Sequence, residues 1–180
     1  MRTLHEALAQ CRTLVVEGPD GIGRGALLAE VARAGFAIRH SRGHLHHVDP
    51  TRPYRELLSA PGRLAVDGGI IHELVYGPLR RGHSRVTWIQ ALDFAEAVAA
   101  RNGALLQLAR SGRAADAESA EAAEAYARAF RTLAQHAPVV TVAMVGTADT
   151  SGPEGPGPPI RTPDTSTHQR ARYVRKLTVR

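Results

Sequence analysis

A glycine-rich turn near the N-terminus has residue types and spacings that suit phosphate binding. The run from Thr13 to Glu17 (TLVVE) is typical of a buried strand, and the residues from Gly18 to Gly25 read GPDGIGRG. Gly18 and Gly23 have the spacing of the phosphate-binding pattern G-x-x-x-x-G-K-[ST]. In such a turn, backbone N–H groups point at the anion and the next helix adds partial positive charge. A plain glycine turn between a strand and a helix is the alternative.

The candidates for phosphate contacts are Gly18, Asp20, Gly21, Gly23, Arg24 and Gly25. In the pattern, a lysine reaches the β- and γ-phosphates and a hydroxyl binds magnesium. Arg24 and Gly25 stand at those two positions. Arginine keeps the positive charge, although its planar fork is bulkier than an ammonium group. Glycine has no side chain with which to bind a metal.

A second segment, from Asp67 to Arg85, reads DGGIIHELVYGPLRRGHSR. Together with the turn E-G-P-D-G-x-G, it resembles the thymidylate kinase branch of the phosphate-binding-loop nucleoside monophosphate kinases. Phage and bacterial members of that family have an Asp-Arg pair followed by S-E-x-V-Y-G-P and R-G-x-S-R. The positions that match by residue are Glu73, Val75, Tyr76, Gly77, Pro78, Arg81, Gly82, Ser84 and Arg85. The resemblance covers about residues 13 to 110 and implies a three-layer α/β fold with a mostly parallel five-stranded sheet.

The resemblance also implies an activity: transfer of the γ-phosphate of ATP, with Mg²⁺, to a pyrimidine deoxynucleoside monophosphate. The implied catalytic residues are Arg24, Asp67 and Arg110, and the implied metal residue is Asp67, for which a helix N-cap is the alternative role. Arg110 and Arg113 follow a strand where these kinases have a flexible lid. The implied substrate contacts are Glu17, Glu73, Tyr76, Arg81 and Arg85. A solvated surface position is the alternative for each arginine, and core packing is the alternative for Tyr76.

Three departures from the family affect positions that have a chemical role in it. Besides Arg24 and Gly25, Gly68 stands where the family has an arginine that clamps the acceptor phosphate. Phosphoryl transfer depends on positioning and charge neutralisation, so these losses compound. Two functions therefore stay open: a nucleotide kinase in which other arginines such as Arg80 compensate, and a catalytically degenerate relative that acts as a binding or scaffolding subunit. Nucleic-acid binding through the C-terminal tail is a third.

Strand-like and helix-like stretches alternate along the chain, which favours βαβ units and a mostly parallel sheet. Strands are expected at 13–17, 36–38, 63–67, 104–108 and 138–145, and helices at 27–34, 53–58, 84–101 and 114–136. Ser84 is the expected N-cap of the third of these helices. A histidine cluster, at His40, His44, His46 and His47, lacks neighbouring cysteines and a convincing partner pattern. We expect a solvated loop there, with a metal site as the alternative.

Length and charge predict one domain with a tail. A chain of 180 residues suits a single domain, here residues 1–149, followed by a Pro/Gly-rich tail at 150–180. The tail has six basic and two acidic residues, so it carries most of the net charge of +6. The high isoelectric point therefore does not make the domain itself a nucleic-acid binder. We expect a protein partner, a second copy of the chain or nucleic acid to order the tail.

The expected location is the cytoplasm, without a membrane anchor. Cys11 is the single cysteine, which excludes an intramolecular disulfide. No apolar run reaches the roughly 18 residues that a membrane span needs, and the first residues lack the apolar core of a signal peptide.

Overall fold

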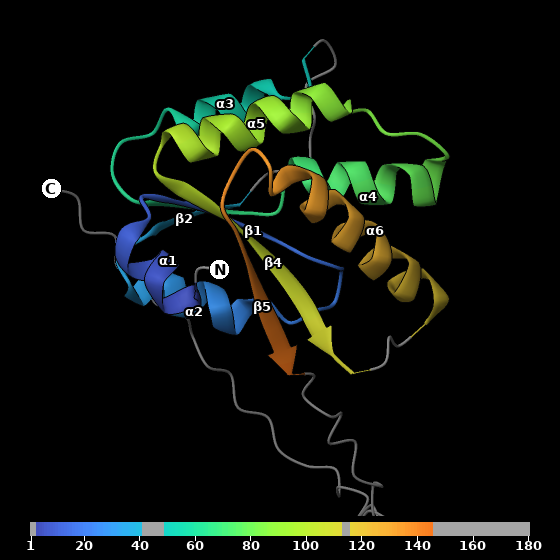
Figure 1. Cartoon of the computed structure of the whole chain (residues 1–180), viewed down its shortest axis with the longest axis horizontal. Coiled ribbons are helices and arrows are strands. Elements are labelled where there is room, and N and C mark those ends of the chain that lie inside the picture. Colours follow the sequence, from blue (N-terminus) through green and yellow to red (C-terminus); the bar gives the residue numbers. More distant parts are fainter. Residues whose placement is uncertain (1–2, 41–48, 113–115, 146–180) are drawn as a thin grey trace, which may run out of the picture. The chain divides into compact units, whose positions relative to one another are not determined.

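The computed structural model describes residues 3–40, 49–112 and 116–145, which form a five-stranded sheet and six helices (Figure 1). The helices are α1 (Leu4–Gln10), α2 (Gly25–Arg33), α3 (Arg52–Leu58), α4 (Ile70–Arg81), α5 (Trp88–Ala100) and α6 (Ala117–Leu133). The strands are β1 (Thr13–Glu17), β2 (Ala37–His40), β3 (Leu64–Asp67), β4 (Gly103–Ser111) and β5 (Val139–Val145). Within the described ranges, no helix is long and apolar enough to cross a lipid bilayer.

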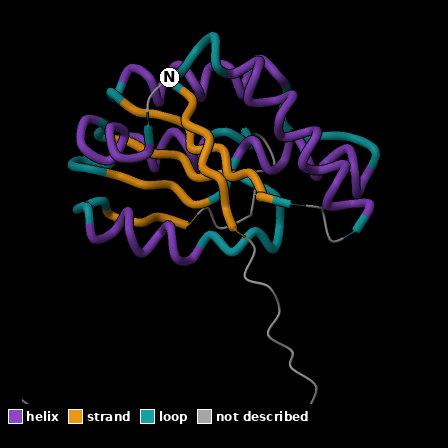
Figure 2. Tube along the Cα trace, turned by 60° about the horizontal axis from the view of Figure 1, so that its bottom comes forward, coloured by secondary structure: helices purple, strands orange, loops and turns teal. Residues whose placement is uncertain are grey.

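The strands are all parallel and lie in the order β2-β3-β1-β4-β5. The chain moves one way across the sheet from β1 to β2 and the other way in every later connection. Because crossovers are right-handed, α2 lies on the opposite face from α3, α4, α5 and α6. Figures 1 and 2 show helices on both faces, with α1 beside α2. The fold is a three-layer α/β arrangement, and the parallel sheet is the one that the alternation of elements predicted.

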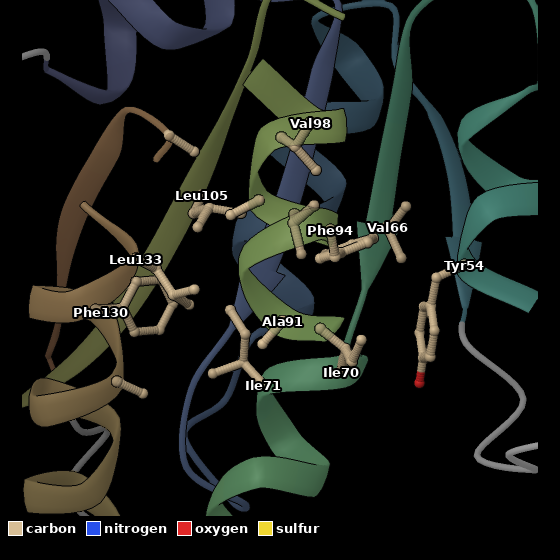
Figure 3. Packing of buried hydrophobic residues seen from close by; sticks show 14 of the residues in the cluster. Tyr54, Val66, Ile70, Ile71, Ala91, Phe94, Val98, Leu105, Phe130 and Leu133 are labelled. Atoms are coloured by element: carbon tan, nitrogen blue, oxygen red, sulfur yellow. The ribbon is translucent and has the colours of Figure 1, made fainter. Parts of the chain in front are cut away.

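Alternating strand residues divide the core into two clusters. Val15 and Leu105 face α3 to α6, whereas Leu14 and Leu106 face α1 and α2, as the two-residue period of a strand requires. Figure 3 shows the larger cluster, in which Phe94 of α5 lies among side chains from neighbouring elements. Its ring meets the edge of Tyr54, with centroids 5.7 Å apart. These clusters hold the carboxyl ends of the strands in place.

The helices differ most from expectation between residues 70 and 101. Thr87, not Ser84, is the N-cap of α5: its hydroxyl accepts a hydrogen bond from the Gln90 N–H, and the Gln90 side chain accepts one from the Thr87 N–H. The Ser84 hydroxyl instead bonds to the backbone of Val86. The expected N-cap was therefore wrong. A separate helix, α4, precedes α5, and its internal Pro78 conceals it in the sequence.

One further difference concerns the start of the chain. α1 had not been expected, although Thr3 and Glu6 form a capping box at its start. The predicted tail at 150–180 lies outside the described residues, and its partner stays a prediction.

Gly103, the first residue of β4, leaves no room for a side chain. A Cβ there would lie 2.6 Å from the Val98 carbonyl oxygen and 2.8 Å from that of Thr13, both of which are backbone atoms. We expect Gly103→Ala to lower the free energy of unfolding by about 1–3 kcal/mol, measured by urea denaturation.

Gly25→Ala is the matched control for Gly103→Ala. Nothing lies within 4 Å of a Cβ at Gly25, and alanine favours a helix over glycine by up to about 1 kcal/mol. The two substitutions should therefore change stability in opposite directions. Equal unfolding midpoints for the two variants would contradict the close packing at Gly103.

Candidate functional site

The glycine-rich turn connects the carboxyl end of the central strand β1 to α2. Gly21 and Gly23 have φ values of +70° and +76°, a region that glycine adopts readily. Gly18 lies against β4, where a Cβ would come within 2.7 Å of the Leu108 Cβ. The chain leaves β1 for one face of the sheet, whereas β3 and β4 lead to helices on the other face. Parallel α/β sheets commonly bind ligands at such a switch point.

Arg24, at the lysine position of the phosphate-binding pattern, is paired with Asp67 at the end of β3. Its Nη1 lies 3.1 Å from Asp67 Oδ1, and its Nη2 donates to the Gly18 carbonyl oxygen at 3.4 Å. His40, at the end of β2, has its Nδ1 2.8 Å from the other carboxylate oxygen, Oδ2. The Asp67 side chain is only 15% exposed. Each of its oxygens thus faces a nitrogen, that of the mostly buried Arg24 on one side and that of the exposed His40 on the other.

This arrangement of Asp67 does not fit a magnesium ion. Magnesium in nucleotide sites needs near-octahedral oxygen ligands, usually one or two carboxylates, substrate phosphates and several waters. Arg24 and His40 already approach the two oxygens of Asp67, and Gly25 supplies no hydroxyl. Over residues 3–40, 49–112 and 116–145, no group of three or more His, Cys, Asp or Glu side chains could hold a metal ion. Asp67 here anchors Arg24 and His40.

Arg110 reaches the same loop from the end of β4. Its Nη2 donates to the Gly21 carbonyl oxygen at 3.1 Å, so Arg24 and Arg110 both contact the loop backbone. A cavity of about 170 Å³ opens between the loop, β4 and α6, which is smaller than the roughly 300–1,000 Å³ of most small-molecule sites. Its lining includes Pro19, Asp20, Gln107, Arg110 and Ser119. Arg113 lies outside the described residues.

Glu17, the last residue of β1, is a completely buried acid beside the loop. In the described part of the chain, neither of its carboxyl oxygens makes a hydrogen bond of good geometry, although the backbone N–H groups of Ile71 and His72 lie near them. Burial raises the pKa of Glu17 to about 8, against the lowering effects of Arg24 and of the nearby His72 and Ile71 backbone N–H groups. Glu17 is therefore mostly protonated and neutral at pH 7. A neutral carboxyl group does not cancel the charge of Arg24.

Asp20, on the loop, is held by side chains from α4. Its carboxylate lies 3.1 Å from His72 Nε2 and 2.9 Å from Arg80 Nη2, and its backbone N–H donates to the Tyr76 hydroxyl at 2.8 Å. Arg80 also pairs with Glu118 of α6 at 2.7 Å. Burial acts to raise the pKa of Asp20, but hydrogen bonds from Arg80 and His72 outweigh it and lower that pKa. Asp20 therefore carries a charge that is tied to α4.

Tyr76 lies in the core beneath this cluster, at 4% exposure. The Arg80 guanidinium stands 4.1 Å from its ring centroid, and Tyr126 meets it edge-on at 6.3 Å. These contacts agree with the packing alternative for Tyr76. Its stacking on a nucleotide base stays a prediction.

Glu73, Arg81 and Arg85 meet in a contact between α4 and the turn that follows it. Glu73 Oε1 accepts hydrogen bonds from Arg81 Nη2 and from the Arg85 backbone N–H, the latter at 2.9 Å. Gly77 permits this approach, because a Cβ there would lie 2.9 Å from both Glu73 Oε1 and the His83 carbonyl oxygen. The contact gives these residues a role in shaping the α4–α5 turn. Their contact with a substrate stays a prediction.

No protein-family model matches the chain, and no curated protein or solved structure matches it either. Arg24, Asp67 and Arg110 lie around the loop, and their catalytic roles stay a prediction. The structure adds His40, His72 and Glu118, which sequence reasoning had not placed there. His40 had been singled out only as part of the histidine cluster; it ends β2 and is the register partner of Asp67 in β3, a pairing that only the structure shows.

The buried carboxyl group of Glu17 makes stability depend on pH. The folded chain keeps its proton up to a pKa of about 8, against a usual value of 4.5, so the folded state binds more protons between these values. Stability therefore falls as pH rises across this window, by up to about 1.4 kcal/mol per pH unit. Glu17→Gln removes the titration, and its stability relative to the wild type should rise from about pH 5 to pH 8.

Urea denaturation at several pH values measures this effect. Glu30→Gln, at an exposed position of α2, is the control and should give a difference that hardly varies with pH. A pH-independent difference between Glu17→Gln and the wild type would show that Glu17 is ionised in the folded chain.

Proposed function

We propose that the chain is a nucleotide-binding protein of the thymidylate kinase-like group, which holds nucleotide phosphates on the loop from Gly18 to Gly25. The observation that carries this proposal is the placement of two arginines, Arg24 and Arg110, on a glycine-rich loop at the carboxyl end of the central strand. The N-terminus of α2 adds partial positive charge. The sequence resemblance of residues 17–23 and 67–85 to these kinases supports the same assignment.

Binding without phosphoryl transfer is the form of this function that the contacts favour. Asp67, the implied metal residue, is engaged by Arg24 and His40. Gly68 offers no side chain to an acceptor phosphate, and Arg80 is held by Asp20 and Glu118. A nucleotide would then act as a structural or regulatory ligand of a subunit in a larger assembly.

Transfer of the ATP γ-phosphate to a pyrimidine deoxynucleoside monophosphate is the second candidate. One observation favours it: Arg110 contacts the loop at Gly21 from the position at which the resembling kinases have their lid. An arginine supplied to a transferring phosphoryl group can raise the rate by several orders of magnitude.

A nucleotide titration tests the proposed binding. We expect ATP or ADP to raise the melting temperature of the full chain, since a ligand at a hundred times its Kd adds about 2.7 kcal/mol of stability. Arg110→Ala should weaken binding by about tenfold, because a charged hydrogen bond to phosphate is lost. Arg33→Ala, at the far end of α2, is the control and should bind like the wild type. A panel of nucleotides that neither shifts the melting temperature nor gives heat in calorimetry would refute the proposal.

Restoring the phosphate-binding pattern separates a degenerate binder from an adapted enzyme. Arg24→Lys with Gly25→Thr returns a point charge and a hydroxyl to the loop and frees one oxygen of Asp67. For a degenerate kinase relative, we expect the double variant to gain magnesium-dependent ATP affinity of about tenfold or more. An enzyme adapted to arginine should instead lose ADP release in a coupled assay. Arg33→Lys is the control for the change from arginine to lysine. Gly68→Arg can be added as a third substitution if the missing contact to the acceptor phosphate limits turnover.

A further inference from the structure

We infer that the loop binds the phosphates of a nucleotide without a divalent cation, and that the ion pair of Arg24 with Asp67 takes the place of the metal. This inference rests on the proposed function and specifies its ligand, a metal-free nucleoside di- or triphosphate. It departs from the Mg²⁺ with ATP that the sequence resemblance implies.

The first argument is the position of the Arg24 guanidinium. Its Nη1 is 3.1 Å from Asp67 Oδ1, while Nη2 contacts the Gly18 carbonyl oxygen at 3.4 Å. A magnesium ion bound at Asp67 would have to displace this guanidinium or share the carboxylate with a like charge. The metal also lacks the hydroxyl ligand of the pattern, because Gly25 has no side chain.

The second argument is the number of N–H donors on Arg24 that its contacts leave unused. An arginine has five N–H donors in a planar fork, and the two contacts of Arg24 use only part of them. The remaining donors can bind a phosphate oxygen while the ion pair with Asp67 stays intact. Asp67 then holds the fork in place, which reduces the side-chain entropy that phosphate binding would cost.

The third argument is the balance of charge next to the loop. Arg24 pairs with Asp67, Arg80 is shared between Asp20 and Glu118, and burial keeps Glu17 protonated at neutral pH. Arg110, on Gly21, and the N-terminus of α2 present positive charge at the loop itself. A free nucleotide triphosphate carries more negative charge than its magnesium complex, so it is the species that this loop attracts more strongly.

Calorimetric titration of the full chain in EDTA and in excess magnesium chloride tests the inference. The probes are ATP and inorganic tripolyphosphate. We expect both to bind in EDTA, and ATP to bind there at least as tightly as in magnesium.

A substitution of Asp67 provides a second reading. Asp67→Asn removes a negative charge but keeps an amide oxygen that can accept the hydrogen bond from Arg24 and hold its fork in place, so affinity in EDTA should be kept or should rise. If Asp67 bound a metal ion instead, Asp67→Asn would weaken ATP binding only in magnesium chloride. Asp93→Asn, at an exposed position of α5, is the matched control, and melting curves establish that each variant is folded. If Asp67→Asn does not fold, the comparison of ATP binding by the wild type in EDTA and in magnesium chloride tests the inference by itself.

The outcomes separate this inference from the proposed function. ATP binding that appears only with magnesium, or that is tighter there, overturns the inference and leaves the proposed function standing. The absence of ATP binding under both conditions overturns both. Binding in EDTA that Asp67→Asn preserves supports the metal-free site.

Discussion

The ion pair of Arg24 with Asp67 joins the end of the loop that follows β1 to the carboxyl end of the neighbouring strand β3. The parallel register places Val16 of β1 beside Asp67, and His40 of β2 is the register partner of Asp67 on its other side. The pair therefore fixes the end of the loop against β3 and brings His40 to the same carboxylate. Because the pair is shielded, removing one partner would leave an uncompensated charge. The shape of the loop and the charge that it presents both depend on this contact.

Beside the pair lies a second constraint, the burial of Glu17. The start of α4 closes over this acid: a Cβ on Gly69 would lie 3.2 Å from Glu17 Oε1 and 2.9 Å from Tyr54 Cε1. Burying a polar group without a hydrogen bond costs about 1–3 kcal/mol, and protonation is the response that avoids a larger cost for a charge. The burial of Glu17 therefore lowers the stability of the fold, but its neutral carboxyl group adds no second negative charge beside Arg24. Functional sites commonly show such a loss of stability.

The sequence predicted the strands better than the helices, for physical reasons. A buried parallel strand is a short apolar run, and RLAVD and PVVTVAMV can be recognised by composition alone. α4 is concealed by Gly77 and Pro78, whose low helix propensity is outweighed by the packing of the turn onto Glu73. The order of the strands and the meeting of His40 with Asp67 depend on contacts between distant segments, which local patterns do not encode. The sequence predicted Arg24 on the loop, but its pairing with Asp67 depends on the register of β1 and β3.

The contacts also explain why a ligand would bind differently at Arg24 and at Asp20. A phosphate can meet the spare donors of Arg24 without breaking its pair, whereas a ligand at Asp20 competes with Arg80 and His72. Arg80 and Asp20 are 45% and 46% exposed, and exposed ion pairs contribute at most about 1 kcal/mol each. Displacing two such contacts weakens the binding of that ligand by at most about thirtyfold and does not exclude it. The geometry thus favours phosphate binding at Arg24 over ligand binding at Asp20.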